Sequence, residues 1–376
     1  MEKAKKKING KKMALFLLGA IVALFILIKL VPAGISLIFG HSISQDCITI
    51  TPDAISNYDF DIYKNQIALF NSQGLKTYNY KGEYQWDIPA KVYDPYLDTN
   101  GNYAILADID GGEIQHVSGD TVDFVIRTSQ PIQKAAVSSD GYVAVVTSEK
   151  GYKSLVSVYD NKGEEIYKWY SGEIYVVDAQ IAPDHKKMAV VGIDTSKNNL
   201  SSVVMFFDLS SDNPTAQVIL DNSLAYQLVY AGQDVVVLTD HALKLIKNSG
   251  EIKAEYDFSG RSLHAFDLEN TSKMVLALSQ KDTDNSANSQ IVVLNEKLKQ
   301  TASNNLPVQI TMLDERNGAI AAGGQRKLYV LTTGGRIKAS GDMVKDAKYI
   351  KLTSDKKHIV TLSGSLVNIY QIKLGR

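Results

Sequence analysis

Three carboxylates in this sequence are of a type and placement that could support hydrolytic chemistry. Asp59, Asp61 and Asp98 lie on or beside segments that we expect to be the innermost strands of a repeated sheet. Two carboxyl groups facing one glycosidic bond can act as general acid and as base or nucleophile. Because acidic side chains at a channel mouth are more often solvated than catalytic, a polysaccharide hydrolase or lyase is the alternative function here, not the leading one.

No other assembled catalytic or metal-binding motif is found. The six histidines include no pair at metal-ligand spacing, and the single cysteine, Cys47, offers no Cys/His set. The stretch Asp98–Asn102 begins like a calcium loop but has Tyr103 where glycine is required, and 282–286 has Ala287 there. Phosphate-loop, dinucleotide and nucleophile-elbow motifs are missing. We therefore expect no catalytic residue, no metal and no cofactor.

The composition is that of a globular protein. Of 376 residues, 45% are hydrophobic and 22% charged, which excludes disorder as the main state. The 40 basic and 41 acidic residues nearly cancel, but six lysines lie within residues 1–12, so the remainder is mildly acidic. Such a body lacks the basic groove that contacts phosphates, and we expect no nucleic-acid partner.

Residues 13–40 form one long apolar segment in which Lys29 is the only charge. About 20 helical residues cross the hydrocarbon core of a bilayer, and the lysine-rich residues ahead of the segment favour a cytoplasmic N-terminus. A cleavable signal peptide, the alternative, would have a shorter apolar region and a small-x-small site. The sequence predicts a basic cytoplasmic tail (1–12) and a single-pass signal anchor (13–40) in the cell membrane. Its first partner would be the lipid bilayer, and the rest of the chain would be extracytoplasmic.

The remainder repeats a unit of about 41 residues. Each unit opens with a short strand, a polar turn and a compact apolar run, at 59–70, 96–107, 135–146, 179–191, 228–238, 266–278, 310–322 and 349–362. A third apolar strand, a turn rich in Gly, Asn, Asp or Lys, and a more polar fourth strand follow. Runs such as VAVVT and VVVLT are apolar at successive positions, which indicates a sheet covered on both faces. The pattern predicts an all-β fold, a β-propeller of four-stranded blades.

Eight blades are expected, and seven remain possible if the first or last unit packs differently. The last unit (349–373) supplies only three strands, and the β-rich segment 46–51 belongs to no unit. Adding that segment to the last blade would close the ring and remove an exposed edge. We therefore expect a short linker at 41–45 and a propeller over 46–376.

The basic head, single span and divergent repeats resemble the membrane-anchored β-propeller proteins of Gram-positive bacteria, many of which have no known function. The phrase AAVSSDGYVAVVT (135–147) is also similar to repeats of WD-repeat and quinoprotein-like propellers. The Trp-Asp pair that ends true WD repeats occurs only as Trp86-Asp87, in a predicted outer strand. Trp86 and Trp169 are the only tryptophans, so the docking signature of quinoprotein blades is missing. The resemblance implies an envelope propeller without a quinone cofactor.

Connections on one face of the propeller offer a candidate binding surface. Links from a fourth strand to the next first strand emerge on the same face as the second-to-third loops. The between-blade segments there carry Tyr93, Tyr96, Tyr175, Tyr226, Arg261 and His264. Tyr and Arg often anchor interfaces, although Tyr also packs between blades. The sequence thus predicts a non-enzymatic module that binds or scaffolds an envelope protein or glycan.

Overall fold

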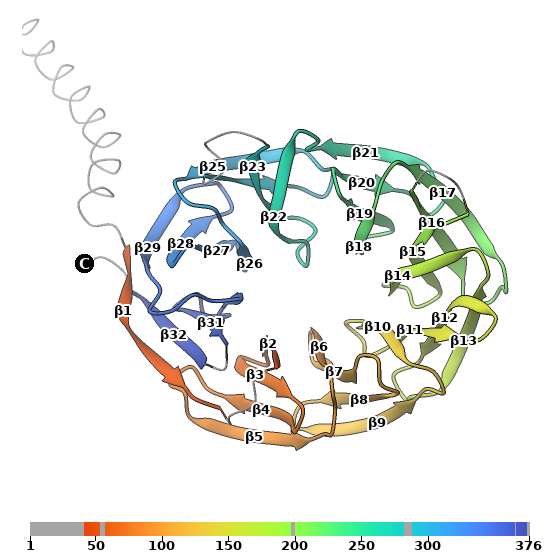
Figure 1. The fold of residues 1–376 in the computed structure, drawn as a ribbon, viewed down its shortest axis with the longest axis horizontal. Coiled ribbons are helices and arrows are strands. Elements are labelled where there is room, and N and C mark those ends of the chain that lie inside the picture. The colour runs from red at the N-terminus through yellow and green to blue at the C-terminus, as the bar shows by residue number, and fades with distance from the viewer. Residues whose placement is uncertain (1–40, 53–56, 197–199, 282–287, 365, 374–376) are drawn as a thin grey trace, which may run out of the picture.

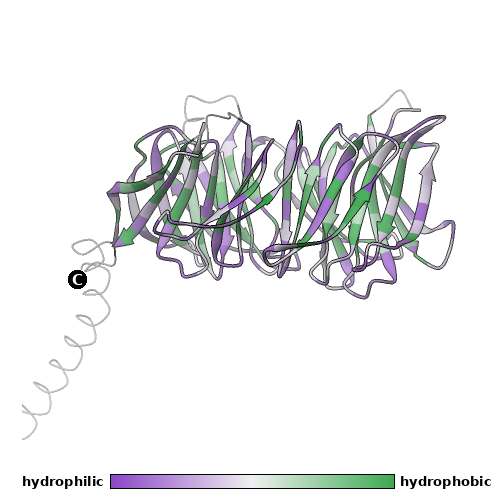
Figure 2. Cartoon of the chain, turned by 90° about the horizontal axis from the view of Figure 1, so that it is seen from below, coloured by the Kyte–Doolittle hydropathy of each residue, from purple (hydrophilic) through white to green (hydrophobic). Residues whose placement is uncertain are grey.

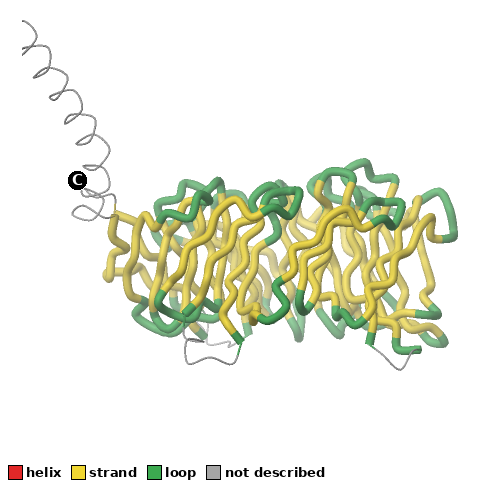
Figure 3. Tube along the Cα trace, turned by 90° about the horizontal axis from the view of Figure 1, so that it is seen from above, coloured by secondary structure: helices red, strands yellow, loops and turns green. Residues whose placement is uncertain are grey.

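A computed structural model describes residues 41–52, 57–196, 200–281, 288–364 and 366–373. Within these ranges the chain forms 32 β-strands and no helix, arranged as a ring of blades around a central axis (Figure 1). Loops cover both faces of the disc (Figure 3). The predicted all-β propeller is confirmed. The predicted tail (1–12) and membrane helix (13–40) lie outside the described residues, among which no helix is long and apolar enough to cross a bilayer.

In the first seven blades the strands follow chain order from the axis outward, whereas β1 is the outermost strand of the eighth; neighbouring strands within a blade are antiparallel. Blade 1 contains β2 (Tyr58–Tyr63), β3 (Gln66–Asn71), β4 (Gly74–Tyr78) and β5 (Tyr84–Pro89), and blade 2 contains β6 (Pro95–Asn100), β7 (Tyr103–Asp108), β8 (Glu113–Ser118) and β9 (Thr121–Arg127). Blade 3 contains β10 (Ile132–Val137), β11 (Val143–Glu149), β12 (Tyr152–Tyr159) and β13 (Glu165–Ser171), and blade 4 contains β14 (Ile174–Ile181), β15 (Lys187–Asp194), β16 (Ser201–Asp208) and β17 (Pro214–Asp221). Blade 5 contains β18 (Ala225–Ala231), β19 (Asp234–Thr239), β20 (Ala242–Ile246) and β21 (Ile252–Asp257), and blade 6 contains β22 (Arg261–Asp267), β23 (Met274–Gln280), β24 (Ser289–Leu294) and β25 (Gln300–Leu306). Blade 7 contains β26 (Met312–Arg316), β27 (Ala319–Gly324), β28 (Lys327–Thr332) and β29 (Ile337–Asp342), and blade 8 contains β30 (Tyr349–Leu352), β31 (His358–Ser363), β32 (Leu366–Lys373) and β1 (His41–Ile50).

The apolar patterning of the strands follows from their depth in the blade. Second strands such as β19 and β23 are buried over almost their whole length, because adjacent blades cover both of their faces. Outer strands such as β21 and β25 alternate between exposed and half-buried residues, as expected of a strand with one wetted face. Figure 2 shows hydrophobic stretches along the strands and many hydrophilic turns on both faces.

The core is divided into eight clusters, one at each junction between neighbouring blades of the described chain. At the first junction, Phe70 of blade 1 packs with Leu106 of blade 2. At the last, Val360 and Ile369 of blade 8 pack with Leu69 of blade 1. Each blade is therefore covered on both sides only when the ring is closed, which explains why no unit could be stable alone.

Strand β1 completes the last blade and also links it to its neighbour. It pairs antiparallel with β32 and, through His41↔Ala339 and Ser42↔Ser340, parallel with β29. The described strands thus form seven hydrogen-bonded sheets: six of four strands and one of eight, which contains blades 7 and 8. All eight repeat units therefore form four-stranded groups of the ring, and β1 joins the last two groups into one hydrogen-bonded sheet.

The expected linker at 41–45 is instead part of β1, which begins at His41. Ile43 is only 4% exposed and packs in the core between blades 7 and 8. Gly341 on β29 makes this possible, because a Cβ at that position would lie 2.7 Å from the Cβ of Ile43. A register shift between Ile43 and Cys47 then carries the chain into its pairing with β32. Gly341 lies about 300 residues along the chain from Ile43, so the sequence alone did not reveal that the two positions meet.

Candidate functional site

Aspartates on the innermost strands connect neighbouring blades. In five junctions of the described chain, an aspartate oxygen accepts a hydrogen bond from a backbone N–H on the innermost strand of the next blade. These pairs are Asp59 with Leu97 (2.8 Å), Asp98 with Val137 (2.8 Å), Asp178 with Leu228 (3.0 Å), Asp267 with Glu315 (2.5 Å) and Asp314 with Leu352 (2.7 Å). Innermost strands do not pair with each other, so these bonds satisfy backbone donors that would otherwise be unpartnered.

Burial perturbs the ionisation of these inter-blade aspartates. Burial raises the pKa of Asp98 to about 7, because the hydrogen bond from the Val137 N–H and the charge of Lys134 offset the cost of burial only in part. Burial, together with the charges of Glu269 and Asp314, likewise raises the pKa of Asp267 to about 7. Desolvation disfavours the charged form of a carboxyl group, and both groups therefore titrate near neutral pH.

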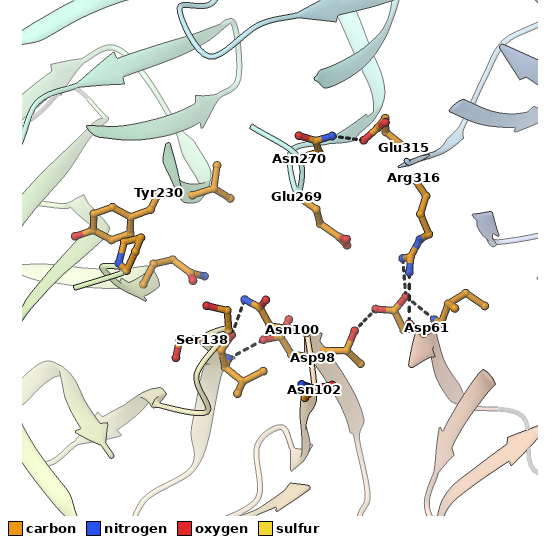
Figure 4. Close-up of a pocket in the computed structure, with 18 of the residues that line it drawn as sticks. Asp61, Asp98, Asn100, Asn102, Ser138, Tyr230, Glu269, Asn270, Glu315 and Arg316 are labelled. Carbon is orange, nitrogen blue, oxygen red and sulfur yellow. Dashed lines mark hydrogen bonds and ion pairs between the residues drawn. The ribbon is translucent and has the colours of Figure 1, made fainter. Parts of the chain in front are cut away.

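A five-residue ion network lies where blades 6, 7, 8 and 1 meet at the axis. The Lys351 Nζ lies 3.0 Å from Asp61 Oδ1, 3.3 Å from Glu269 Oε1 and 3.6 Å from Asp314 Oδ1. Arg316 reaches Asp61 at 3.6 Å (Figure 4) and Asp314 at 3.8 Å. Burial alone would lower the pKa of Lys351, but these carboxylates outweigh it and hold that pKa well above its usual value. Burial opposes ionisation of Asp61 too, yet Lys351 and Arg316 lower its pKa.

The three carboxylates considered for hydrolysis therefore all have structural partners. Asp59 and Asp98 each hold the N–H of a neighbouring blade. Asp61 pairs with Lys351 and accepts a 2.7 Å hydrogen bond from the Thr99 hydroxyl. A carboxylate fixed in this way is poorly placed to exchange protons with a substrate, and the geometry favours a role in ring closure. Among the described residues, no group of three or more His, Cys, Asp or Glu side chains is placed to hold a metal ion.

A polar cavity of about 920 Å³ surrounds the axis at one end. All eight blades contribute to it, mainly through their first-to-second turns, and Figure 4 shows Asp98, Asn100, Glu269 and Arg316 around it. We call this side of the disc the turn face. The sequence pointed to Asp61 and Asp98 in this region but missed Glu269, because only the closed ring brings blade 6 opposite blade 1.

The opposite face carries most of the exposed tyrosines. It is formed by the fourth-to-first and second-to-third connections, because successive strands of a blade run in opposite directions. The tyrosine face, as we call it, is defined by Tyr93 (85% exposed), Tyr152 (49%), Tyr170 (44%), Tyr175 (49%), Tyr226 (52%) and Tyr349 (37%). Of the remaining large exposed apolar side chains described, seven, including Tyr84, are scattered along the outer strands. Single apolar residues of that kind are ordinary, whereas six tyrosines on one face are not.

The six residues proposed from the sequence separate into two groups. Tyr93, Tyr175 and Tyr226 lie on the tyrosine face with exposed rings. The other three contact neighbours within the disc: Tyr96 accepts a hydrogen bond from Lys134 Nζ (2.8 Å), Arg261 donates to Gln290 (3.1 Å) and Tyr256 (3.2 Å), and His264 contacts Ser279 Oγ (2.6 Å) and Gln309. Tyr152, Tyr170 and Tyr349 were missed, although each lies at a strand end beside a second-to-third or between-blade connection.

Part of the tyrosine face is held in place by contacts between its own side chains. The rings of Tyr152 and Tyr170 lie 4.9 Å apart. The Lys153 Nζ lies 5.3 Å from the centre of the Tyr175 ring, donates 2.6 Å to the Glu173 carbonyl, and also reaches the Thr195 hydroxyl at 3.1 Å. Aromatic rings fixed before binding lose little conformational entropy when a partner covers them.

Comparison with known proteins places the chain by fold and by family. No curated protein sequence matches it. Three similar structures are the C-terminal WD40 domain of Sif2 (TM-score 0.64, 11% identity, 89% of this chain and 99% of that one), the computationally designed Ika8 protein (0.58, 14%, 89% and 98%) and BamB from Moraxella catarrhalis (0.56, 13%, 88% and 100%). At such identities the likeness shows the propeller fold alone. Residues 47–372 match the model of a "Family of unknown function (DUF5711)", and the chain belongs to that family.

Proposed function

We propose that this protein is a non-enzymatic binding module, anchored in the cell membrane, that holds an envelope protein against its tyrosine face. The observation that carries the proposal is the gathering of six exposed tyrosines on one face of a rigid disc. Tyrosine supplies a large, stiff, amphipathic contact surface and is enriched among residues that dominate binding energy. A propeller fold of this kind is compatible with a binding or scaffolding role.

The proposed location rests on the sequence ahead of the propeller. The apolar segment 13–40 is long enough for one span, and the lysines of 1–12 favour a cytoplasmic N-terminus. Strand β1 begins at His41, directly after that segment, so the propeller would sit close to the outer surface of the bilayer. An envelope protein reaching the disc from outside would then be its partner.

Site-specific photo-cross-linking in intact cells tests the proposed binding face. A photoreactive phenylalanine analogue replaces Tyr175 or Tyr226 in the full chain, and Tyr84 serves as control. Tyr84 is 53% exposed and Tyr226 52%, so the two positions differ in location and not in accessibility. We expect Tyr175 and Tyr226 to give one common cross-linked partner, and Tyr84 to give none.

A binding role through this face also requires that the cross-link depend on neighbouring rings. Tyr152→Ala should weaken the cross-link formed from position 175, because truncating an anchor at an interface centre commonly costs about 2 kcal/mol or more. Equal cross-linking from Tyr84 and Tyr226, or a pattern unchanged by Tyr152→Ala, would contradict the proposal.

A further inference from the structure

Basic side chains gather on one part of the turn face, around the junction of blades 7, 8 and 1. Lys356 and Lys357 lie in the β30–β31 turn, Lys64 in the β2–β3 turn, Lys81 in the β4–β5 turn, Arg336 beside β29, and Lys373 at the end of β32. All six are exposed, and within the described chain none of them forms an ion pair. We call these six residues the basic sector. Two exposed carboxylates in the same turns, Glu83 and Asp355, offset only part of this charge, so the sector keeps an excess of cations and a positive potential.

The same face is acidic on its far side. The turns of blades 2 to 4 carry an excess of carboxylates, among them Asp120, Asp140, Asp160, Asp184 and Asp212. Two of these carboxylates have local polar partners. Asp140 Oδ2 lies 2.9 Å from His185 Nε2, and Asp160 accepts hydrogen bonds from backbone N–H groups of its own turn. The charge on the turn face is therefore unevenly distributed: it is positive around blade 8 and negative across the axis from blade 8. A flat anionic surface would attract one edge of the disc and repel the other.

The chain enters the propeller at the basic sector. Ser42 pairs with Lys373 and Ile43 with Ile372, whose N–H donates 2.7 Å to the Lys357 carbonyl. The first described residues are thus one strand away from the lysine turn of blade 8. Because β1 starts at His41, an anchor formed by the preceding residues would join the propeller beside these lysines.

We propose that the basic sector rests on the anionic head groups of the bilayer, so that the disc is held with its turn face toward the membrane and its tyrosine face toward the outside. This rests on the proposed membrane anchoring. Lysines near an anionic lipid surface each add attraction that decays within a Debye length, so a sector adjacent to the anchor gains most from it. The arrangement leaves the tyrosine face free for a partner and directs the polar cavity at the lipid.

The full chain in lipid vesicles tests this orientation by energy transfer to acceptor-labelled head groups. In a Cys47→Ser background, single dyes are placed by Gln371→Cys beside the basic sector, Asn161→Cys on the acidic side, and Tyr226→Cys on the tyrosine face. Replacing neutral phosphatidylcholine partly by phosphatidylglycerol should raise transfer from position 371 above that from 161 and 226. High salt should reverse the rise.

A pair of charge reversals supplies the matched comparison. The double variant Lys356→Glu with Lys357→Glu should lower the ratio of discs whose turn face contacts the lipid to discs that do not contact it, roughly tenfold or more. The reason is that four charge units change beside the lipid surface. Lys162→Glu with Lys186→Glu makes the same charge change on the acidic side and should not lower it. The proposal would be overturned if energy transfer from position 371 did not change with anionic lipid, or if both double variants lowered that transfer equally. Flotation with neutral vesicles after an alkaline wash tests the anchor separately, because it does not depend on the basic sector.

Discussion

Replacing Lys351 by methionine removes the central cation of the ion network while keeping most of its volume. The Lys351 side chain is 18% exposed, and its two buried partners, Asp61 and Asp314, are 12% and 1% exposed. Breaking a buried pair by removing one partner commonly costs about 3–5 kcal/mol, because the other charge is left without compensation. Glu269 is 60% exposed and contributes little to the loss.

Arg316 moderates the expected effect. It stays within 3.6 Å of Asp61 and 3.8 Å of Asp314, so part of the compensation survives in the variant. We therefore expect Lys351→Met to lower the free energy of unfolding by about 3 kcal/mol, at the lower end of that range. Adding Asp61→Asn should restore part of the loss, since one of the two buried carboxylates no longer carries a charge.

Urea unfolding of the detergent-solubilised full chain, followed by far-ultraviolet circular dichroism at pH 7, measures the change. The control is Lys253→Met, which breaks a shorter contact: Lys253 Nζ lies 2.7 Å from Asp234 Oδ2, but its side chain is 49% exposed. An exposed pair contributes up to about 1 kcal/mol. Equal losses in Lys351→Met and Lys253→Met would refute the reasoning that burial, and not distance, determines the contribution.

Two further predictions concern pH and strand packing. Asp98 and Asp267 have pKa values of about 7 against a usual 3.8, so the folded chain holds protons that the unfolded chain releases. Their contribution to stability is present below pH 4 and is lost as the pH rises to about 7; Asp98→Asn should flatten this decline in urea titrations between pH 4 and 8. Gly341→Ala would place its Cβ 2.7 Å from that of Ile43, and should lower the free energy of unfolding by about 1–3 kcal/mol. Gly172→Ala, where nothing lies within 4 Å, should change it little, and a loss equal to that of Gly341→Ala would contradict the packing argument.

The repeated blade could be predicted because its signals are local. Apolar runs such as those of β11 and β19, followed by turn residues such as Asn161 and Gly163, report strand depth within one unit of sequence. The incomplete last unit also indicated a strand from the other end of the chain. The position where that strand begins could not be predicted, because it depends on contact between Ile43 and Gly341 in distant blades.

The candidate site was predicted less completely for the same reason. Exposed tyrosines at strand ends are visible in the sequence, but their exposure depends on what neighbouring blades cover, as the contrast between Tyr226 and Tyr96 shows. The role of Asp59 and Asp98 depends on backbone donors about 40 residues further along the chain. Charges that meet across the axis, such as Lys351 and Asp61, are brought together only by closure of the ring.

Tyrosine-specific labelling tests most directly whether the tyrosine face is covered in the cell. Native membranes and the detergent-purified full chain are labelled in parallel, and modification at each tyrosine is measured by mass spectrometry. We predict that Tyr175 and Tyr226 are labelled several-fold less in native membranes than in the purified protein, while Tyr84, equally exposed on outer strand β5, loses less labelling than either. Equal labelling of Tyr175 and Tyr226 in the two preparations would contradict a bound partner on this face.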